Sequence, residues 1–336
     1  MTGNIRWGIL GSGDVAEKKG GPALYQTPGS ELVAVMRRDK NKAEDFARRH
    51  GARRAYHNVA DLLADPEIDA IYVATPPHLH CEQTLACARA GKHVLVEKPM
   101  ALNGTECDRM IAACRDAGVF LHVAYYRRFY PKFVRARQLL DEGAIGQVLG
   151  ARLLLCAWSG AAGWRTNPAL SGGGHFVDVG SHRLDLLLHL LGDATEVSGF
   201  AANLVGHHAA ENDVALSLRF ASGVVASGAF HFQTQPPRDV LEIYGTAGTL
   251  ALDPFDGDTL MLRHDPNRHG DNVAERRFCY PNPSPTHGPL VEALLRVYHG
   301  SPEPHVSGEE GAKTTRIMDA VLEAALIVPD SHPAAG

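Results

Sequence analysis

Four ionisable side chains recur at helical spacing between residues 172 and 192. Asp178, His182, Asp185 and His189 follow three glycines at intervals of four, three and four residues. Residues three and four apart lie over one another on an α-helix, so the spacing predicts one shared stripe. Such a stripe suits a metal site, a catalytic acid–base group, or the hydrated side of an ordinary helix. The spacing alone does not choose among the three.

Two members of the stripe are suited to moving a proton to and from a hydroxyl group. Histidine has an unperturbed pKa of about 6.5, so His182 can take and return a proton near neutral pH. Asp178 lies four residues earlier and can orient or polarise the imidazole. Leucines fill the other side of the predicted helix, so we expect Asp185 to support His182 and His189 to be a satisfied or solvated histidine.

A glycine-rich turn near the start of the chain is typical of phosphate binding. Ile5 to Leu10 form an apolar run, followed by Gly11-Ser-Gly13-Asp-Val-Ala16 and a stretch that can be helical. Such a turn lets the backbone approach a pyrophosphate, which rests on the helix N-terminus. A second strand, residues 31–39, ends about 20 residues later, as a dinucleotide fold requires. The predicted cofactor contacts of this turn are Gly11, Ser12, Gly13, Asp14 and Val15.

The end of the second strand bears on cofactor choice. An acidic residue there would hold the ribose hydroxyls of NAD(H), but this chain has Met36-Arg37-Arg38. The arginine fork matches phosphate geometry, so we predict that NADP(H) is preferred, with NAD(H) possible. The alternative is a solvated basic turn in which Asp39 caps the next helix.

Polar residues follow two further apolar strands, in the segments 68–80 and 92–100. Alternating strands and helices predict a parallel, doubly wound sheet that binds ligands at the carboxyl ends of its strands. A lysine at such an end can stabilise the alkoxide that develops from an alcohol. The predicted cofactor contacts at these ends are Thr75, Pro76, His80, Glu97 and Lys98.

Several of these motifs together resemble the Gfo/Idh/MocA family, named for glucose–fructose oxidoreductase and inositol dehydrogenase. The resemblance is carried by Gly8 to Ala16, residues 74–80, Glu97-Lys-Pro99 and residues 172–182, in order over nearly the whole chain. It implies a Rossmann domain followed by a domain with a large, mostly antiparallel sheet. The exposed face of that sheet commonly builds an oligomer interface, so we expect a homodimer or homotetramer.

The resemblance also transfers functional residues to this chain. The family's catalytic lysine, aspartate and histidine correspond to Lys98, Asp178 and His182, all of which are present. The family's bond between the positions of Lys98 and Pro99 is often cis.

The remaining two thirds of the chain read as hairpins, which predict an antiparallel sheet. The overall expectation is an α/β protein with a Rossmann domain at residues 1–123 and an α+β domain at 124–336. As an alternative, the closing helical segments pack back towards the first domain. The predicted hairpin strands are residues 212–220 with 224–233, and 239–245 with 249–253.

Substrate contacts are expected from residues that follow the first domain. Family relatives usually carry His or Asn near the position of Tyr125. The alternative for these side chains is edge-strand packing and surface ion pairs. The candidates, beside Asp178 and His182, are Tyr125, Arg127, Arg128, Trp164 and Arg165.

Composition narrows the classes of partner. The chain has 336 residues and a net charge of −5, which favours two domains and gives no reason to expect nucleic acid or an anionic membrane. Apolar stretches are too short to span a bilayer, and the first ten residues lack a signal-peptide layout, so we expect a cytoplasmic protein. Six cysteines without a C-x-x-C pair predict buried thiols and no structural zinc.

The leading hypothesis is an NADP(H)-dependent oxidoreductase acting on a sugar, polyol or related cyclic hydroxy compound. One alternative is a metal-dependent hydrolase that uses the four-residue stripe. A second is a regulator that binds the dinucleotide without turnover. A third is an enzyme that oxidises a sugar carbon transiently to allow epimerisation, elimination or hydrolysis. The sequence leaves the substrate, its stereochemistry and the physiological direction open.

Overall fold

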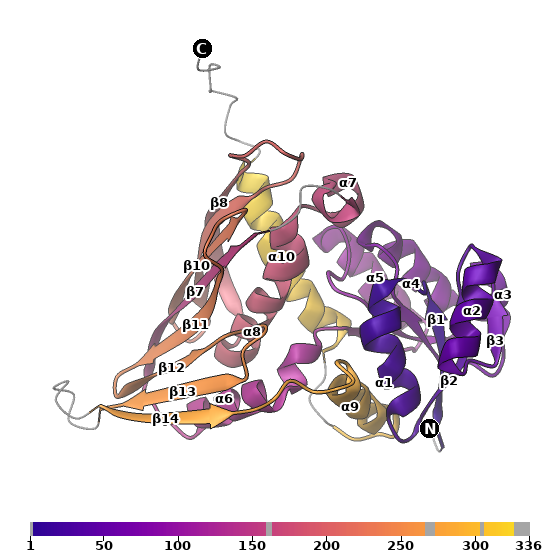
Figure 1. Ribbon diagram of the computed structural model, residues 1–336, viewed down its shortest axis with the longest axis horizontal. Coiled ribbons are helices and arrows are strands. Elements are labelled where there is room, and N and C mark those ends of the chain that lie inside the picture. The colour runs from indigo at the N-terminus through magenta and orange to yellow at the C-terminus, as the bar shows by residue number, and fades with distance from the viewer. Residues whose placement is uncertain (1–2, 159–162, 266–272, 303–305, 326–336) are drawn as a thin grey trace, which may run out of the picture. The chain divides into compact units, whose positions relative to one another are not determined.

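The computed structural model describes residues 3–158, 163–265, 273–302 and 306–325 (Figure 1). Two compact units divide the chain: Met1–Val134 with Tyr280–Thr315, and Arg135–Cys279 with Arg316–Gly336. The sequence predicts a single division after residue 123. In the structure the first unit extends to Val134 and also includes Tyr280–Thr315. The chain returns to the first unit after Cys279, because helix α9 (Gly288–Tyr298) buries an apolar face there. The ring of Tyr298, for example, lies 6.1 Å from that of Trp7.

The first unit contains a six-stranded parallel sheet in the order β3-β2-β1-β4-β5-β6. Its central strands are buried on both faces, as expected for strands covered by helices. This confirms the doubly wound Rossmann sheet. The strands are β1 (Ile5–Leu10), β2 (Ser30–Met36), β3 (Arg54–Tyr56), β4 (Ala70–Val73), β5 (His93–Val96) and β6 (Leu121–Val123).

Helices alternate with these strands, and local sequence signals set where several of them begin. Asp39 accepts a hydrogen bond from the backbone N–H of Lys42 and so caps α2. Asn58 and Asn103 cap α3 and α5 in the same way. The helices are α1 (Gly21–Gln26), α2 (Lys40–His50), α3 (Val59–Ala64), α4 (His80–Arg89) and α5 (Gly104–Asp116).

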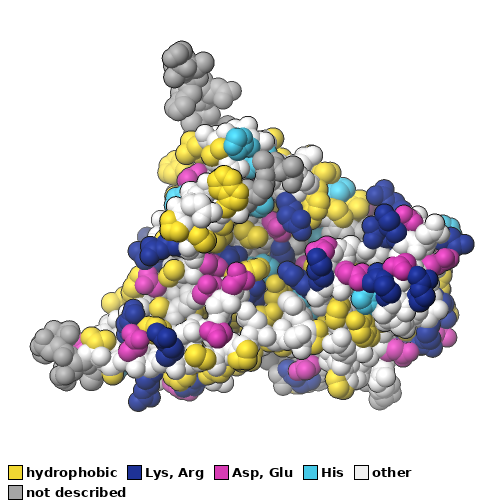
Figure 2. Space-filling model, in the orientation of Figure 1, with side chains coloured by type: hydrophobic (Ala, Val, Ile, Leu, Met, Phe, Trp, Pro, Cys, Tyr) yellow, Lys and Arg dark blue, Asp and Glu magenta, His cyan; other side chains and the backbone are white. Residues whose placement is uncertain are grey.

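The outer side of α2 is covered by ion pairs. Asp45 pairs with Arg48 at 2.6 Å and with Arg49 at 2.7 Å. Figure 2 shows acidic and basic side chains interspersed over this part of the first unit. Exposed pairs of this kind stabilise a helix only slightly.

The second unit contains an eight-stranded sheet in the order β14-β13-β12-β11-β7-β10-β9-β8. All neighbours are antiparallel except β7 and β10. This confirms the mostly antiparallel sheet and both predicted hairpins. The strands are β7 (Val148–Ala157), β8 (Ala194–Ala202), β9 (Asp213–Phe220), β10 (Val225–Phe232), β11 (Arg238–Gly245), β12 (Gly248–Leu252), β13 (Thr259–His264) and β14 (Ala274–Cys279).

Helix α8 (Ser181–Leu191) packs on one face of this sheet, preceded by a π-helical turn, Phe176–Gly180. The rings of Phe176 and Phe230 meet edge to face there at 5.0 Å. In Figure 1 the helical segments that belong to the second unit lie on this side of its sheet, and no described helix of that unit covers the other face. The remaining helices are α6 (Pro131–Asp141), α7 (Pro168–Ser171) and α10 (Gly308–Ala325), of which α6 and α10 cross a boundary between units.

Two predictions from composition can be compared with the structure. Within the described residues, no helix has both the length and the apolar character needed to span a membrane. The thiols in α4 and α5 are free and buried, as predicted, whereas Cys156 is half-buried and Cys279 is exposed. The buried ones are Cys81, Cys87, Cys107 and Cys114.

Candidate active site

The glycine-rich turn joins three strands of the first unit at their carboxyl ends. Gly11 has a φ of +102°, which favours glycine, and its N–H donates to the carbonyl oxygen of Met36 at 3.0 Å. A Cβ at Gly11 would lie 2.8 Å from Cγ2 of Thr75, whereas a Cβ at Gly13 would meet nothing within 4 Å. Gly11 is therefore required by the fold, and Gly13 leaves open space beside the backbone.

The residues of this turn fit the pyrophosphate of a dinucleotide. Ser12 is 4% exposed, and its Oγ has no hydrogen-bond partner among the described residues. A buried hydroxyl without a partner is unfavourable, and a phosphate oxygen would satisfy it. Val15 is the N-cap of the π-helical turn Ala16–Gly20, which continues into α1, and no side chain described by the structure caps it. Its first N–H groups therefore suit an anion.

The two arginines after β2 have different surroundings. Arg37 is half-buried, and its Nη1 donates to the backbone oxygen of Ser12 at 2.6 Å. Its backbone N–H donates to the carbonyl oxygen of Tyr56 at 3.1 Å. Arg38 is exposed. Asp39 caps α2, as expected under the alternative interpretation, a solvated basic turn. Arg37 thus contacts the glycine-rich turn, whereas Arg38 is a surface residue.

His80 links the segments that follow β4 and β5. The side chain is fully buried, with Nδ1 3.0 Å from the carbonyl oxygen of Pro99 and Nε2 2.8 Å from that of Thr75. Burial lowers its pKa, and the two carbonyl oxygens oppose that effect. Thr75 donates its hydroxyl to Gln83 at 2.6 Å, and Pro76 is half-exposed beside it. His80 is predicted as a cofactor contact, but its ring is engaged in joining these segments.

Glu97 is also engaged within the first unit. Its Oε1 accepts a hydrogen bond from the hydroxyl of Tyr72 at 2.6 Å and lies 3.0 Å from Nε2 of His287. Oε2 accepts the backbone N–H of Lys98 at 3.2 Å. Burial disfavours the charged carboxylate, but the hydrogen bond and charge of His287 outweigh it and lower the pKa of Glu97 to about 2.

This network gives Glu97 partners within the protein, and two of them are residues that the sequence did not single out. Glu97 is predicted to contact the cofactor, but its oxygens hold Tyr72, His287 and the backbone of Lys98. Lys98 follows β5 directly and is half-buried, and its bond to Pro99 is cis, as the resemblance implies. Neither Tyr72, inside an apolar strand, nor His287, in a loop 190 residues from Glu97, carries a sequence signal for this role.

The four-residue stripe of the second unit differs from the expected α-helical one. Asp178 lies in the π-helical turn Phe176–Gly180, and His182, Asp185 and His189 lie in α8. The turn interrupts the regular α-helical spacing assumed for the stripe. His182 and Asp185 are buried, at 3% and 1% exposure, whereas Asp178 and His189 are half-buried. The four positions therefore have unequal surroundings.

Asp178 forms an ion pair with one of the predicted substrate contacts. Its Oδ2 lies 2.9 Å from Nε of Arg165, whose guanidinium is 4.6 Å from the ring of Trp164. The Arg165 side chain is half-exposed, and that of Asp178 is largely buried. The structure thus brings three predicted residues together within the second unit.

His182 has an aromatic neighbour that sequence reasoning missed. The ring of Phe255, between β12 and β13, meets the imidazole edge to face at 5.8 Å. The same ring lies 4.7 Å from the guanidinium of Arg183, which is ion-paired with Asp239. Phe255 stands in a turn rich in Asp and Gly, which predicts a loop but not a contact with His182.

The remaining substrate candidates are buried in the first unit. Tyr125, Arg127 and Arg128 are 0%, 5% and 8% exposed. The guanidinium of Arg127 lies 5.4 Å from the ring of Tyr126, and Nη1 of Arg128 lies 3.5 Å from a carboxylate oxygen of Glu310. These contacts are of the packing and ion-pair kind that the sequence leaves as the alternative.

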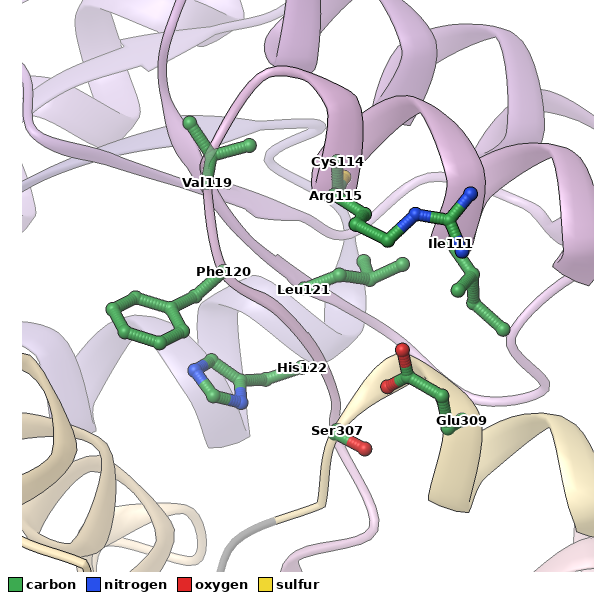
Figure 3. A pocket seen from close by; sticks show the side chains of 9 residues that line it. All are labelled: Ile111, Cys114, Arg115, Val119, Phe120, Leu121, His122, Ser307 and Glu309. Carbon is green, nitrogen blue, oxygen red and sulfur yellow. The ribbon is translucent and has the colours of Figure 1, made fainter.

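A cavity of about 190 Å³ in the first unit lies away from the predicted site residues (Figure 3). Phe120 and His122 line it from the start of β6, and Glu309 from the first turn of α10. None of the predicted site residues lines it. The amino end of a parallel strand is the opposite edge from the one that binds ligands in doubly wound sheets.

The described residues contain no group of three or more His, Cys, Asp or Glu placed to hold a metal ion. The metal-dependent hydrolase therefore gains no ligand set from the part of the chain that the structure describes.

Both halves of the chain match models of known protein domains. Residues 5–125 match the family model described as "Oxidoreductase family, NAD-binding Rossmann fold", and residues 133–251 match the GFO/IDH/MocA C-terminal domain. Oxidoreductase P35 of Formosa agariphila is 34% identical over 328 residues, covering 95% of this chain and 98% of that protein. The 1,5-anhydro-D-fructose reductase of Ensifer adhaerens is 31% identical, covering 95% and 96%.

A solved structure gives the same likeness. The aldose-aldose oxidoreductase from Caulobacter crescentus, complexed with glycerol, matches with a TM-score of 0.85 and 28% identity. The match covers 96% of this chain and 98% of that one. The similarity therefore extends over both units.

Proposed function

Because the chain belongs to the Gfo/Idh/MocA oxidoreductase family, we propose that it interconverts an alcohol and a carbonyl on a sugar, polyol or related cyclic hydroxy compound. NADP(H) is the preferred cofactor, and NAD(H) is possible. The substrate class is supported by two of the similar proteins, which are named as a reductase of 1,5-anhydro-D-fructose and an aldose-aldose oxidoreductase.

The contact between Arg37 and Ser12 carries the cofactor preference. It holds a guanidinium beside the glycine-rich turn, at the strand end where an acidic residue would hold ribose hydroxyls. Arginine presents five N–H donors, so one bond to the Ser12 carbonyl leaves others for a ribose phosphate. Arg38 is exposed and supplies additional positive charge.

The binding residues follow from the first unit. Ser12 would offer its hydroxyl to a pyrophosphate, and the backbone N–H groups around Gly13 and Val15 would be available to it, because no described side chain caps this turn and the space beside Gly13 is open. Gly11, Thr75 and Pro76 shape the adjoining backbone. When bound, the dinucleotide supplies the redox chemistry, exchanging a hydride with the substrate carbon.

Proton handling falls to Lys98, Asp178 and His182, as the family resemblance implies. In the oxidation direction His182 takes the hydroxyl proton of the substrate, and the ammonium of Lys98 stabilises the negative charge that develops on that oxygen. Asp178 orients this pair and is itself held by Arg165. In the reduction direction His182 returns the proton to the oxygen. Positioned acid–base groups of this kind contribute about 10²- to 10⁴-fold to the rate.

His80 and Glu97 take supporting roles in this proposal. His80 joins the backbone at Thr75 to that at Pro99, and Glu97 binds the backbone N–H of Lys98. Trp164 and Arg165 are the favoured substrate contacts because both are accessible and linked to Asp178. Tyr125 and Arg127, which are buried, support neighbouring residues.

The open face of the eight-stranded sheet supports a homodimer or homotetramer. Strand register aligns five apolar residues across five strands on this face, and Phe200 in this row is 71% exposed. The adjacent row is polar and includes an ion pair between Arg152 and Glu242 at 2.9 Å. An exposed apolar row beside polar residues is typical of a protein interface. The apolar row comprises Phe200, Ala215, Ala229, Leu154 and Val240.

A substrate screen tests the proposed function. Purified protein is incubated with polyols and aldoses plus NADP⁺, and with keto sugars plus NADPH, and the absorbance of the reduced cofactor is followed. Net turnover with at least one compound class is expected. A tightly retained dinucleotide with no net absorbance change, but with altered sugar product, would instead favour transient oxidation. Binding of dinucleotide without any product would favour a regulator.

A further inference from the structure

Glu211 lies two residues before β9, and the backbone of the next residue is hydrogen-bonded to both neighbouring strands. The residue is buried, at 9% exposure. The neighbouring Asn212 donates its backbone N–H to the carbonyl oxygen of Ala202 at 2.9 Å and accepts the N–H of Phe232 at the same distance. Since these bonds reach β8 and β10, the backbone beside Glu211 has little freedom to move.

From this base the carboxylate of Glu211 reaches the start of another element. Its Oε1 accepts the backbone N–H of Gly174 at 2.7 Å. Burial raises the pKa of Glu211, and backbone N–H groups of Gly174, Phe176 and Val177 oppose that rise by favouring the carboxylate. The N–H groups at the start of a helix have no partner within the helix, so the carboxylate satisfies at Gly174 a donor that would otherwise be unpaired.

Two of the three glycines before the helix, Gly173 and Gly174, are explained by close packing at this point. From the sequence alone, these glycines allow either a close approach to a ligand or to the first domain, or a flexible turn. A Cβ at Gly174 would lie 2.8 Å from Cβ of Ala210 and 2.9 Å from Oε1 of Glu211. A Cβ at Gly173 would lie 2.5 Å from Cγ2 of Val177. Close approach is therefore required, but within the second unit and towards the Glu211 segment.

The helix that begins here carries two of the proposed catalytic residues. The π-helical turn Phe176–Gly180 and α8 are continuous, with Asp178 in the turn and His182 in the first turn of α8. We propose that Glu211 is a positioning residue whose carboxylate anchors the N-terminus of this helix to the sheet and so sets where Asp178 and His182 stand. A negative charge at this end also complements the helix dipole. The catalytic consequence rests on the proposed function, whereas the anchoring does not.

Hydrogen exchange and kinetics of two variants test the proposal. Glu211→Ala removes the acceptor, and we expect faster amide exchange in peptides spanning residues 174–182. The same variant should lose about 10- to 100-fold in kcat, because small displacements of catalytic groups are costly. Its dissociation constant for NADPH should stay within about twofold of wild type, since the glycine-rich turn is in the other unit. Glu211→Gln keeps an acceptor oxygen and should recover much of both the protection and the kcat.

Glu196→Ala is the matched control. Glu196 lies on β8 in the same unit, its side chain is 68% exposed, and it pairs with Arg219 on the surface. This variant should leave both exchange and kcat unchanged. Wild-type exchange at residues 174–182 in Glu211→Ala would overturn the proposal, as would a Glu211→Gln variant no better than Glu211→Ala in kcat. Absence of turnover in the wild type would contradict the proposed function. The exchange comparison would still show whether Glu211 anchors the helix.

Discussion

Nε2 of His287 lies 3.0 Å from Oε1 of Glu97, although 190 residues separate the two in the chain. Both side chains are buried, and the same carboxylate oxygen accepts the hydroxyl of Tyr72. The other oxygen binds the backbone N–H of Lys98. The closing part of the chain therefore stabilises the loop that presents the proposed catalytic lysine.

This pair makes the stability of the protein depend on pH in acid. The pKa of Glu97 is lowered from 4.5 to about 2 in the folded state. Its contribution is therefore fully present above pH about 4.5 and is lost as pH falls through about 2, and amounts to about 3 kcal/mol. Urea unfolding of wild type and Glu97→Gln should show a difference in unfolding free energy that shrinks as pH falls from about 6 to 3. A difference that stays constant or grows in acid would contradict this account.

Arg37→Asp should exchange the cofactor preference. The substitution removes the guanidinium beside Ser12 and adds a charge that repels a ribose phosphate. A hydrogen bond to a charged group contributes about 1.5–3 kcal/mol, so the ratio of kcat/KM for NADP(H) to that for NAD(H) should fall by at least about tenfold. Arg38→Asp, at the exposed neighbour, is the control and should change the ratio much less. Strong NAD(H) preference in the wild type would rule out the proposed role of Arg37.

Lys98→Met should separate chemistry from binding. The side chain keeps most of its length but loses the ammonium, so we expect kcat to fall by about 10²-fold or more. NADPH titration should give a dissociation constant close to that of wild type. Lys40→Met, at an exposed lysine on α2, should keep full activity. Retained turnover in Lys98→Met would remove this lysine from the mechanism.

Phe200→Glu should weaken self-association. The substitution places a charge in the apolar row on the open face of the sheet, and burying an unpaired charge in an interface is unfavourable. Size-exclusion chromatography with light scattering should show a smaller species than for wild type. Phe120→Glu changes another exposed aromatic residue, 42% accessible and in the first unit, and should leave the mass unchanged. A monomeric wild type would exclude the interface.

Signals that act over short stretches of chain predicted much of this protein. The turn from Gly11 to Ala16, the alternation of apolar strands with helices, and the hairpins of the second unit each depend on local backbone geometry and periodicity. The resemblance to the Gfo/Idh/MocA family rested on such motifs, and the family models match both halves of the chain. The thiols of α4 and α5 were predictable as buried for the same reason.

Contacts between distant segments were not predictable in this way. The expected stripe required a regular α-helix over Asp178, His182, Asp185 and His189. In the structure this segment begins with a π-helical turn, where it packs against the sheet and the Glu211 segment. Nothing near Glu97 in the sequence points to His287, and nothing near His182 points to Phe255. Their pairing depends on where whole elements come together.

The sequence by itself determined the Rossmann unit, the antiparallel sheet and the identity of the chemically suited residues, because periodicity, turn chemistry and short motifs act within a few residues. The tertiary structure alone decided which of those residues are engaged in support and which have accessible surfaces. Glu97 and His80 form hydrogen bonds with distant segments, and Gly173 and Gly174 pack closely against the segment that contains Glu211. Burial and hydrogen bonding act between segments that only folding brings into contact, so their outcome is not written in local spacing.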